Sequence, residues 1–182
     1  RSRGLGDVYK RQVDDNQNTD IANDINHLVS EYNDSRIIYI KNKENIGGAK
    51  SRNKGIRLSK GDYITFLDDD DFYFKDKLEE QVKFLKNSDF DFVISNLAIL
   101  NQNMTVKDLR YYSWFKSQYE DNNELIVDHY KYHLTGTPTF MFTRELLIDV
   151  DGFPNVSMGH EFHLVDRALR NGYQLGYLDK YL

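Results

Sequence analysis

The alternation of apolar and polar positions predicts a succession of amphipathic helices and short buried strands. Helical spacing, in which apolar residues recur at intervals of three and four, is clear around Ile25 and Leu78. The predicted helices are Asp20–Tyr32, Ala49–Ser59, Lys75–Lys86, Arg144–Val150 (one or two turns) and His160–Asn171. The predicted strands, short runs rich in β-branched and aromatic residues, are Arg36–Ile40, Tyr63–Leu67, Phe90–Ser95, Thr139–Phe142 and Tyr173–Leu178. This order is typical of an α/β fold with a mostly parallel central sheet and helices on both faces.

The periodicity fades between Asn96 and His133, and no element is predicted there. An aromatic cluster, Tyr111–Phe115, stands in this otherwise polar stretch. Such a cluster can stack on a sugar ring, but more often its rings are part of a hydrophobic core.

Composition mainly excludes several classes of protein and of chemistry. The 182 residues are enough for one domain with a sizeable core, and 40% of them are hydrophobic and 14% aromatic. The net charge of −5 provides no basic surface for nucleic acid. No apolar run approaches the roughly 20 residues of a membrane-spanning helix. The absence of cysteine excludes disulfides and thiolate catalysis, and it fits a reducing compartment.

The two ends differ from the rest of the chain. Residues 1–12, RSRGLGDVYKRQ, are basic and carry only Leu5, Val8 and Tyr9 as apolar groups. We expect a non-native or disordered leader here, with native sequence beginning near Val13; a disordered basic arm is the alternative. At the other end, residues 177–182 have the pattern of a strand cut short. We therefore expect one domain over residues 13–182 that is incomplete at both ends.

Four consecutive carboxylates, Asp68–Asp71, follow directly after the predicted strand Tyr63–Leu67. They repel one another and are costly to bury, so they end the strand and place an acidic turn at the end of the sheet. In open α/β sheets ligands bind at this end, and carboxylate oxygens are preferred ligands of Mg²⁺ or Mn²⁺. We favour a divalent-cation site over a solvated turn that caps the next helix. The spaced D-x-D-x-D-G pattern of a calcium loop is absent.

Four further features are weaker candidates when each is taken alone. Asp14–Asp15 lie in a turn-rich cluster and either bind a ligand or cap the following helix. Gly47–Gly48 precede a helix and either present N–H groups to phosphate or form a packing turn, which is the commoner case. Arg52 either neutralises phosphate or lies on a solvated face. Asn53 lies on the inward face of its predicted helix and therefore needs buried hydrogen-bond partners.

The last long helix opens with His160–Glu161. Glu161 falls on the same stripe as Leu164 and Ala168, so its carboxylate stands at the N-terminal end of an inward-facing surface. A general base requires such a partly buried position near a cleft. A glutamate placed favourably on the helix dipole is the competing interpretation. His160 and His163 lack metal-ligand spacing and are interpreted as structural or surface groups.

Taken together, these segments resemble the family 2 glycosyltransferases with the GT-A fold, from Val13 to about Leu178. VDDNQNTD resembles the first nucleotide-binding turn of the family, and NIGGAKSRNKGI resembles its N-x-G-x-x-x-x-R-N helix. GDYITFLDDDDFY resembles the G-[DE]-Y-I-x-F-L-D-x-D-D segment. DGFPN and GHEFHLVDRALRNGY resemble the G-F stretch and the E-D-x-x-L-x-x-R-x-x-x-x-G helix near the acceptor. The family opens with a central apolar strand, roughly V-S-V-I-I-P-x-Y-N, and a helix, neither of which has a counterpart here; RSRGLGDVYKRQ cannot replace that strand.

The resemblance implies a role for each candidate residue. Asp15 contacts the nucleotide base, and Arg52 lies near the diphosphate. Asp68 and Asp70 form the D-x-D pair, with Asp70 the better candidate for direct metal contact and Asp69 beside it on the nucleotide-sugar side. Glu161 occupies the position of the catalytic base, where the family has an aspartate.

The activity that the resemblance implies is transfer of a sugar from a nucleotide-diphosphate sugar, UDP-linked, to an acceptor hydroxyl with inversion. Mn²⁺ or Mg²⁺ is the implied cofactor, and the acceptor is a saccharide or lipid-linked saccharide chosen by residues 96–136. The implied context is bacterial surface polysaccharide synthesis in the cytoplasm, with at most peripheral association with the inner face of the membrane. The alternatives are an inactive fragment, a non-catalytic carbohydrate-binding domain and a sugar nucleotidyltransferase.

Overall fold

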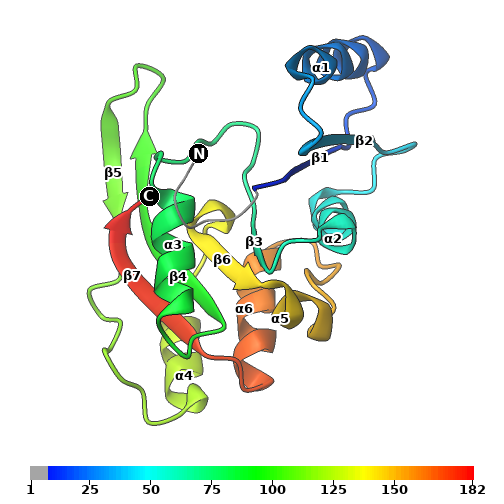
Figure 1. The fold of residues 1–182 in the computed structure, drawn as a ribbon. Helices are drawn as coiled ribbons and strands as arrows, with labels where there is room; N and C mark the ends of the chain where they lie inside the picture. Colours follow the sequence, from blue (N-terminus) through cyan, green and yellow to red (C-terminus); the bar gives the residue numbers. More distant parts are fainter. Residues whose placement is uncertain (1–7) are drawn as a thin grey trace.

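A computed structural model describes residues 8–182, which form two separate β-sheets with helices around them (Figure 1). Residues 1–7, most of the expected leader, lie outside the described residues. Lys10–Gln12, also in the expected leader, are part of the first strand. In the part of the chain that is described, no helix is long and apolar enough to cross a membrane.

The smaller sheet contains only β1 (Lys10–Asp14) and β2 (Ile37–Lys41). The two strands are parallel, with Val13 beside Ile40, and are joined by α1 (Thr19–Tyr32). Helix α2 (Gly48–Leu58) follows β2 and lies on the opposite side of this sheet from α1 (Figure 1). The side-chain oxygen of Asn18 caps α1 by accepting hydrogen bonds from the amides of Asp20 and Ile21.

The larger sheet has five strands in the order β3 (Tyr63–Thr65), β6 (Phe140–Thr143), β4 (Phe92–Leu100) and β5 (Val106–Arg110), with β7 (Leu175–Tyr181) also paired to β4. Only β4 and β7 are parallel; β3–β6, β4–β6 and β4–β5 are antiparallel. The α/β class is confirmed, but the expectation of mostly parallel pairing is wrong for this sheet. Strand direction depends on the connections, and the short turn between β4 and β5 permits only an antiparallel pair.

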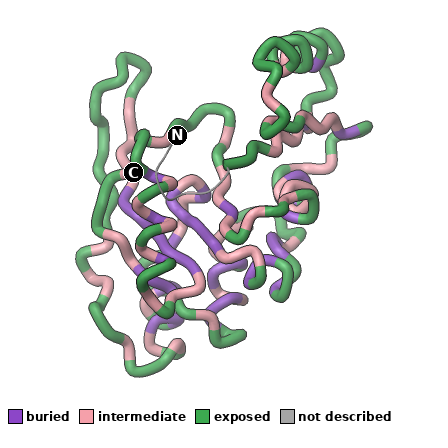
Figure 2. Tube along the Cα trace, viewed as in Figure 1, coloured by how far each residue is buried: buried purple, intermediate pink, exposed green. Residues whose placement is uncertain are grey.

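The two faces of the larger sheet are covered by different helices. Side chains alternate along β4 because successive residues of a strand point to opposite faces. Phe92 and Ile94 face one core, which is shared with α4 (Asn122–Tyr132), α5 (Arg144–Asp149) and α6 (His160–Arg170). Val93 faces the other, which is shared with α3 (Lys77–Lys86). Figure 2 shows that the buried residues gather in this larger unit, whereas the small sheet is mostly exposed or half-buried.

Three elements, β1, β5 and α4, were not predicted, and several boundaries differ from those predicted. Both β5 and α4 lie between Asn96 and His133, where periodicity fades, and an unpredicted 3₁₀ turn, Thr137–Thr139, follows this stretch. Every residue of β5 is exposed. Because this strand has no buried face, its sequence shows no alternation of apolar and polar residues. Strand β3 ends at Thr65, before the predicted end, because the chain turns away toward the acidic residues.

Most of the aromatic cluster packs against the core. Tyr112, Trp114 and Phe115 are half-buried against it, whereas Tyr111 is exposed. The Trp114 ring stacks on Tyr132 of α4 with 4.6 Å between ring centroids. The core interpretation of the cluster is therefore supported over stacking on a sugar ring.

A lysine without an acidic partner is buried in the first turn of α3. Lys77 is fully buried, and its ammonium donates to Gln81 Oε1 at 2.6 Å and lies 3.4 Å from the Thr139 carbonyl oxygen. No carboxylate in the described residues pairs with it. Burial lowers the pKa of Lys77 to about 7, because the charged form loses its hydration.

Replacing this lysine should change how stability depends on pH. Between about pH 7 and 10.5 the unfolded chain binds a proton that folded Lys77 does not, so wild-type stability rises with pH across this interval. In Lys77→Met, the side chain binds no proton in either the folded or the unfolded state, so this pH dependence is absent. The variant should therefore be more stable than wild type near pH 6, by on the order of 2–4 kcal/mol, with the advantage shrinking toward pH 10. Urea unfolding at several pH values measures this.

Lys83→Met, on the exposed face of the same helix, is the matched control and should show no such trend. An advantage that stays constant from pH 6 to 9, or a loss of stability at pH 6, would contradict the assignment.

Candidate functional site

Asp15 holds the loop between β2 and α2 in place. Its Oδ1 accepts hydrogen bonds from the Ile46 amide and Asn42 Nδ2, both at 2.9 Å, and its Oδ2 accepts one from the Gly47 amide at 2.7 Å. Burial raises the pKa of Asp15, but these hydrogen bonds outweigh it and the pKa lies below its usual value. Asp15 is thus an ionised anchor at the carboxyl end of β1.

Its neighbours form a polar network that the sequence did not reveal. Asp14 is buried and accepts hydrogen bonds from the Asn16 amide and the Tyr39 hydroxyl, with Lys41 Nζ 3.3 Å away. Asn42 is also buried; it donates to Ser51 Oγ at 3.0 Å as well as to Asp15. Neither aspartate caps α1, since Asn18 does so.

The paired glycines form a tight turn at the start of α2. Gly47 has a φ of +83°, which favours glycine, and its amide already donates to Asp15. A Cβ on Gly48 would lie 3.3 Å from Arg52 Nη1. Backbone conformation therefore accounts for Gly47 and the close approach of Arg52 for Gly48, and the Gly47 N–H is not free for phosphate.

The acidic turn Asp68–Asp71 follows β3 and is closed by a hydrogen bond from the Asp71 amide to the Asp68 carbonyl oxygen at 3.2 Å. Arg52 Nη2 pairs with Asp68 Oδ1 at 2.6 Å. The carboxylates of Asp69 and Asp70 have no hydrogen-bond or ion-pair partner among the described residues. Burial raises the pKa of Asp71, as do the charges of Asp70 and Asp68. One guanidinium thus faces four crowded carboxylates.

A divalent cation fits this excess of negative charge. In the described part of the chain no three His, Cys, Asp or Glu side chains are arranged to hold a metal ion by themselves. Mg²⁺ and similar ions are commonly bound by one or two carboxylates, with water and substrate phosphates completing the shell. Asp68 and Asp70 would hold such an ion only together with a phosphate-bearing ligand.

Helix α2 connects the acidic turn to the loop that leads into α6. Arg52 lies over the Phe153 ring at 5.6 Å, and Phe153 packs edge-on against Phe66, 5.0 Å away. Asn53 forms two hydrogen bonds with the backbone of Phe153, both 2.8 Å long, one donated and one accepted. The prediction that Asn53 points inward to buried polar partners is confirmed.

Glu161 lies in the first turn of α6 and is half-buried. Leu164, Val165 and Ala168 of its stripe are buried, as the spacing predicted. The Glu161 carboxylate has no hydrogen-bond or ion-pair partner in the described residues, so it is available to a ligand. His160 contacts the Val156 carbonyl oxygen at 2.7 Å, in keeping with a structural role.

The predicted site residues are therefore only partly brought together. Arg52 and Asp68 are in direct contact, and Asp15 orients the loop that begins the helix carrying Arg52. Among the described residues, no hydrogen bond or ion pair links Glu161 to the acidic turn. Asp15 and the turn follow strands of two different sheets, and within residues 8–182 no strand pairs with the second edge of either β1 or β3.

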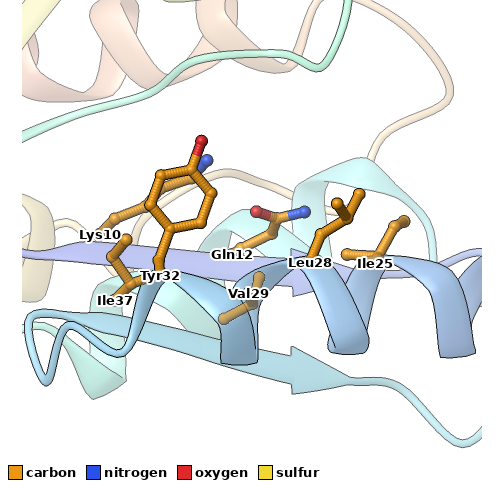
Figure 3. Close-up of a pocket in the computed structure, with 7 residues that line it drawn as sticks. All are labelled: Lys10, Gln12, Ile25, Leu28, Val29, Tyr32 and Ile37. Atoms are coloured by element: carbon orange, nitrogen blue, oxygen red, sulfur yellow. The ribbon is translucent and has the colours of Figure 1, made fainter.

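A separate groove lies between β1 and α1, away from all of these residues. It has a volume of about 360 Å³ and is lined by both apolar and polar side chains (Figure 3). Its lining residues are Lys10, Gln12, Ile25, Leu28, Val29, Tyr32 and Ile37. None of them was predicted as a site residue.

Comparison with known proteins identifies the class. The structure is similar to that of Staphylococcus aureus TarS residues 1–349, with a TM-score of 0.75 and 18% identity, covering 99% of this chain and 51% of that one. It is also similar to the mannosyltransferase PcManGT of Pyrobaculum calidifontis, solved with GDP-Man and Mn²⁺, with a TM-score of 0.67 and 16% identity over 95% and 46% of the two chains. The fold is that of the GT-A glycosyltransferases.

The sequence comparisons identify the family. The model of the family named Glycosyl transferase family 2 matches residues 12–150, and the chain belongs to this family. An uncharacterized glycosyltransferase of Methanocaldococcus jannaschii is 29% identical over 92% of this chain and 56% of its own length. The Escherichia coli UDP-Glc:alpha-D-GlcNAc-diphosphoundecaprenol beta-1,3-glucosyltransferase WfaP is 39% identical over 52% of this chain and 38% of its own. The chain thus spans about half, or less, of these relatives.

The two hydrogen bonds between the Asn53 side chain and the Phe153 backbone, called here the clamp, can be tested directly. Asn53→Ala leaves two backbone groups of Phe153 without partners, so it should lower the free energy of unfolding by about 2 kcal/mol in urea. Asn155→Ala, an exposed asparagine of the same loop, should stay within about 0.5 kcal/mol of wild type. Equal stability of the two variants would show that the clamp contributes nothing.

Proposed function

We propose that this chain is the nucleotide-sugar-binding part of a glycosyltransferase that moves a sugar from a nucleotide diphosphate, UDP-linked, to an acceptor hydroxyl with inversion. The acidic turn carries the proposal. Asp69 and Asp70 have no partners in the described chain, and Arg52 beside them supplies a fixed cationic group. Family membership and the name of the E. coli relative WfaP, which includes UDP-Glc, support it.

Each residue has a defined part in this proposal. Asp15, at the end of β1, contacts the nucleotide base, and Asp68 and Asp69 contact the nucleotide sugar. Asp70 with Asp68 holds Mn²⁺ or Mg²⁺, which when bound neutralises charge on the departing diphosphate. PcManGT, a GT-A structure, was solved with Mn²⁺. Arg52 lies near the diphosphate, held there by Asp68.

Glu161 acts on the acceptor side. Its carboxylate takes the proton of the acceptor hydroxyl while the oxygen attacks the anomeric carbon from the face opposite the diphosphate. The bond between the anomeric carbon and the diphosphate oxygen breaks, and the electron pair leaves with the diphosphate. The configuration is therefore inverted. The free carboxylate of Glu161 at the start of α6 supports this assignment.

The acceptor in this proposal is a saccharide or a lipid-linked saccharide of bacterial surface polysaccharide synthesis. The E. coli relative WfaP supports a lipid-linked acceptor, because its name specifies a diphosphoundecaprenol-linked sugar. The protein would then work in the cytoplasm, at most peripherally attached to the inner face of the membrane.

The second candidate function is that of a folded part of a glycosyltransferase that has no transferase activity by itself. The separation of β1 and β3 into two sheets favours it, because among residues 8–182 the hydrogen bonds and ion pairs that connect Asp15 with the acidic turn run through α2 and its loop. Thermal unfolding with UDP, GDP or TDP, with and without Mn²⁺, tests the main proposal. A Mn²⁺-dependent stabilisation by one nucleotide is expected, and no stabilisation by any of them would favour the inactive part.

Removing the proposed base should abolish most turnover without weakening the binding of the donor. Glu161→Gln keeps the shape of the side chain but cannot accept the proton, so transfer should fall by roughly 10²–10⁴-fold while nucleotide affinity is unchanged. Release of nucleotide diphosphate measures transfer. Glu145→Gln, an exposed glutamate in the first turn of α5, should behave as wild type. Full turnover by Glu161→Gln would disprove the assignment.

Removing the proposed metal ligand should instead weaken the metal-dependent binding of the donor. Asp70→Asn keeps one oxygen ligand but loses its charge, so Mn²⁺-dependent binding of UDP should weaken by roughly tenfold or more in titration calorimetry. Asp89→Asn, an exposed aspartate in another loop, provides the control for the loss of one charge. Unchanged Mn²⁺ dependence in Asp70→Asn would rule out its role as a metal ligand.

A further inference from the structure

Tyr73 joins the two ends of the loop that contains the acidic turn. Its hydroxyl donates a hydrogen bond to the Phe66 carbonyl oxygen and lies 3.0 Å from Thr65 Oγ1. Thr65 in turn donates to the Phe140 carbonyl oxygen of β6 at 2.7 Å. Because Phe66 precedes the acidic turn and Tyr73 follows it, this contact closes the loop at its base.

The ring of Tyr73 is held from below by α3. The Lys77 ammonium lies 4.9 Å from the centre of the Tyr73 ring, within the range of a cation–π contact. Lys77 is fixed by Gln81, which also donates to the Thr139 carbonyl oxygen at 2.7 Å. The tyrosine therefore extends from a rigid, buried support to the end of β3.

Closure matters here because the loop holds mutually repelling charges. Arg52 neutralises Asp68, but Asp69 and Asp70 have no partner in the described residues. A loop free at its base would open and separate these carboxylates. Burial raises the pKa of Tyr73, as do the charges of Asp68 and Asp71, so its hydroxyl stays protonated and able to donate.

We propose that Tyr73 is a positioning residue that holds the acidic turn closed, so that Asp68 and Asp70 face one divalent cation. Tyr73 does not touch the cation or the donor itself. Without it, binding of the cation must first draw the carboxylates together, so more metal is needed for the same occupancy. The metal-binding half of this inference depends on the proposed function, whereas the closure of the loop does not.

Tyr73→Phe removes only the hydroxyl and keeps the ring over Lys77. Tyr63→Phe is the matched control: Tyr63 is half-buried in β3, and its hydroxyl has no hydrogen-bond partner among the described residues. Two measurements are made on the 182-residue chain. The first is amide hydrogen exchange of residues 67–72 without metal, and the second is the Mn²⁺ concentration that gives half-maximal binding of UDP.

In Tyr73→Phe we expect faster exchange confined to residues 67–72, with β4 and β6 still protected. The half-saturating Mn²⁺ concentration should rise roughly 3- to 10-fold, while the UDP affinity at saturating Mn²⁺ stays that of wild type. Tyr63→Phe should show neither change. A purely structural role would instead weaken protection across the sheet and lower UDP affinity at every Mn²⁺ concentration, and this result would overturn the proposal.

Wild-type exchange in residues 67–72, or an unchanged Mn²⁺ requirement, would also overturn it. If the wild-type chain binds no UDP with Mn²⁺, the proposed function fails, and exchange in residues 67–72 alone decides whether Tyr73 closes the loop. Should Tyr73→Phe fail to fold, Thr65→Val replaces it, since it removes the hydroxyl beside the phenol and keeps the shape of the side chain.

Discussion

Helix α2 supplies the polar contacts on which the relative arrangement of the two sheets depends. From its middle, Arg52 pairs with Asp68 of the larger unit, and Asn53 forms two hydrogen bonds with the Phe153 backbone. Just beyond its end, the Ser59 carbonyl oxygen accepts from Arg144 Nε at 3.1 Å. These contacts are partly buried, where removing a partner is costly because the remaining group is left without water. One short helix thus sets where Asp15 lies relative to the acidic turn.

The candidate site concentrates negative charge, and its surroundings show how the fold accommodates this. Hydrogen bonds from backbone and amide groups lower the pKa of Asp15, so its charge is stabilised within the protein. Burial and neighbouring carboxylates raise the pKa of Asp71, so the charges of the acidic turn are not fully compensated. Asp15 is therefore a structural anchor of the loop between β2 and α2. The turn is poised to gain stability from a cation, which is the electrostatic basis of the proposed function.

Much of the fold and some of the site could be predicted from the sequence alone. Helices with a strong apolar stripe, such as α6, begin and end close to the predicted residues because the pattern directly reflects burial of one face. The inward direction of Asn53 followed from its position among apolar neighbours. By contrast, the exposed strand β5 carries no alternation of burial to detect. The antiparallel pairings of β6 depend on contacts between residues about 50 to 80 positions apart, such as Phe92 with Phe142 and Ile64 with Phe142.

The sequence by itself determined the family, the order of the elements and the acidic turn, because these are set by residue types and short spacings. Only the tertiary structure decided which of those residues meet. It placed Arg52 on Asp68, gave both oxygens of Asp15 to the β2–α2 loop, and buried Lys77 beneath Tyr73. Hydrogen bonds and ion pairs form between side chains distant in sequence, and their partners are fixed by how helices and strands pack. That packing is the outcome of the whole folded chain and cannot be obtained from any local pattern.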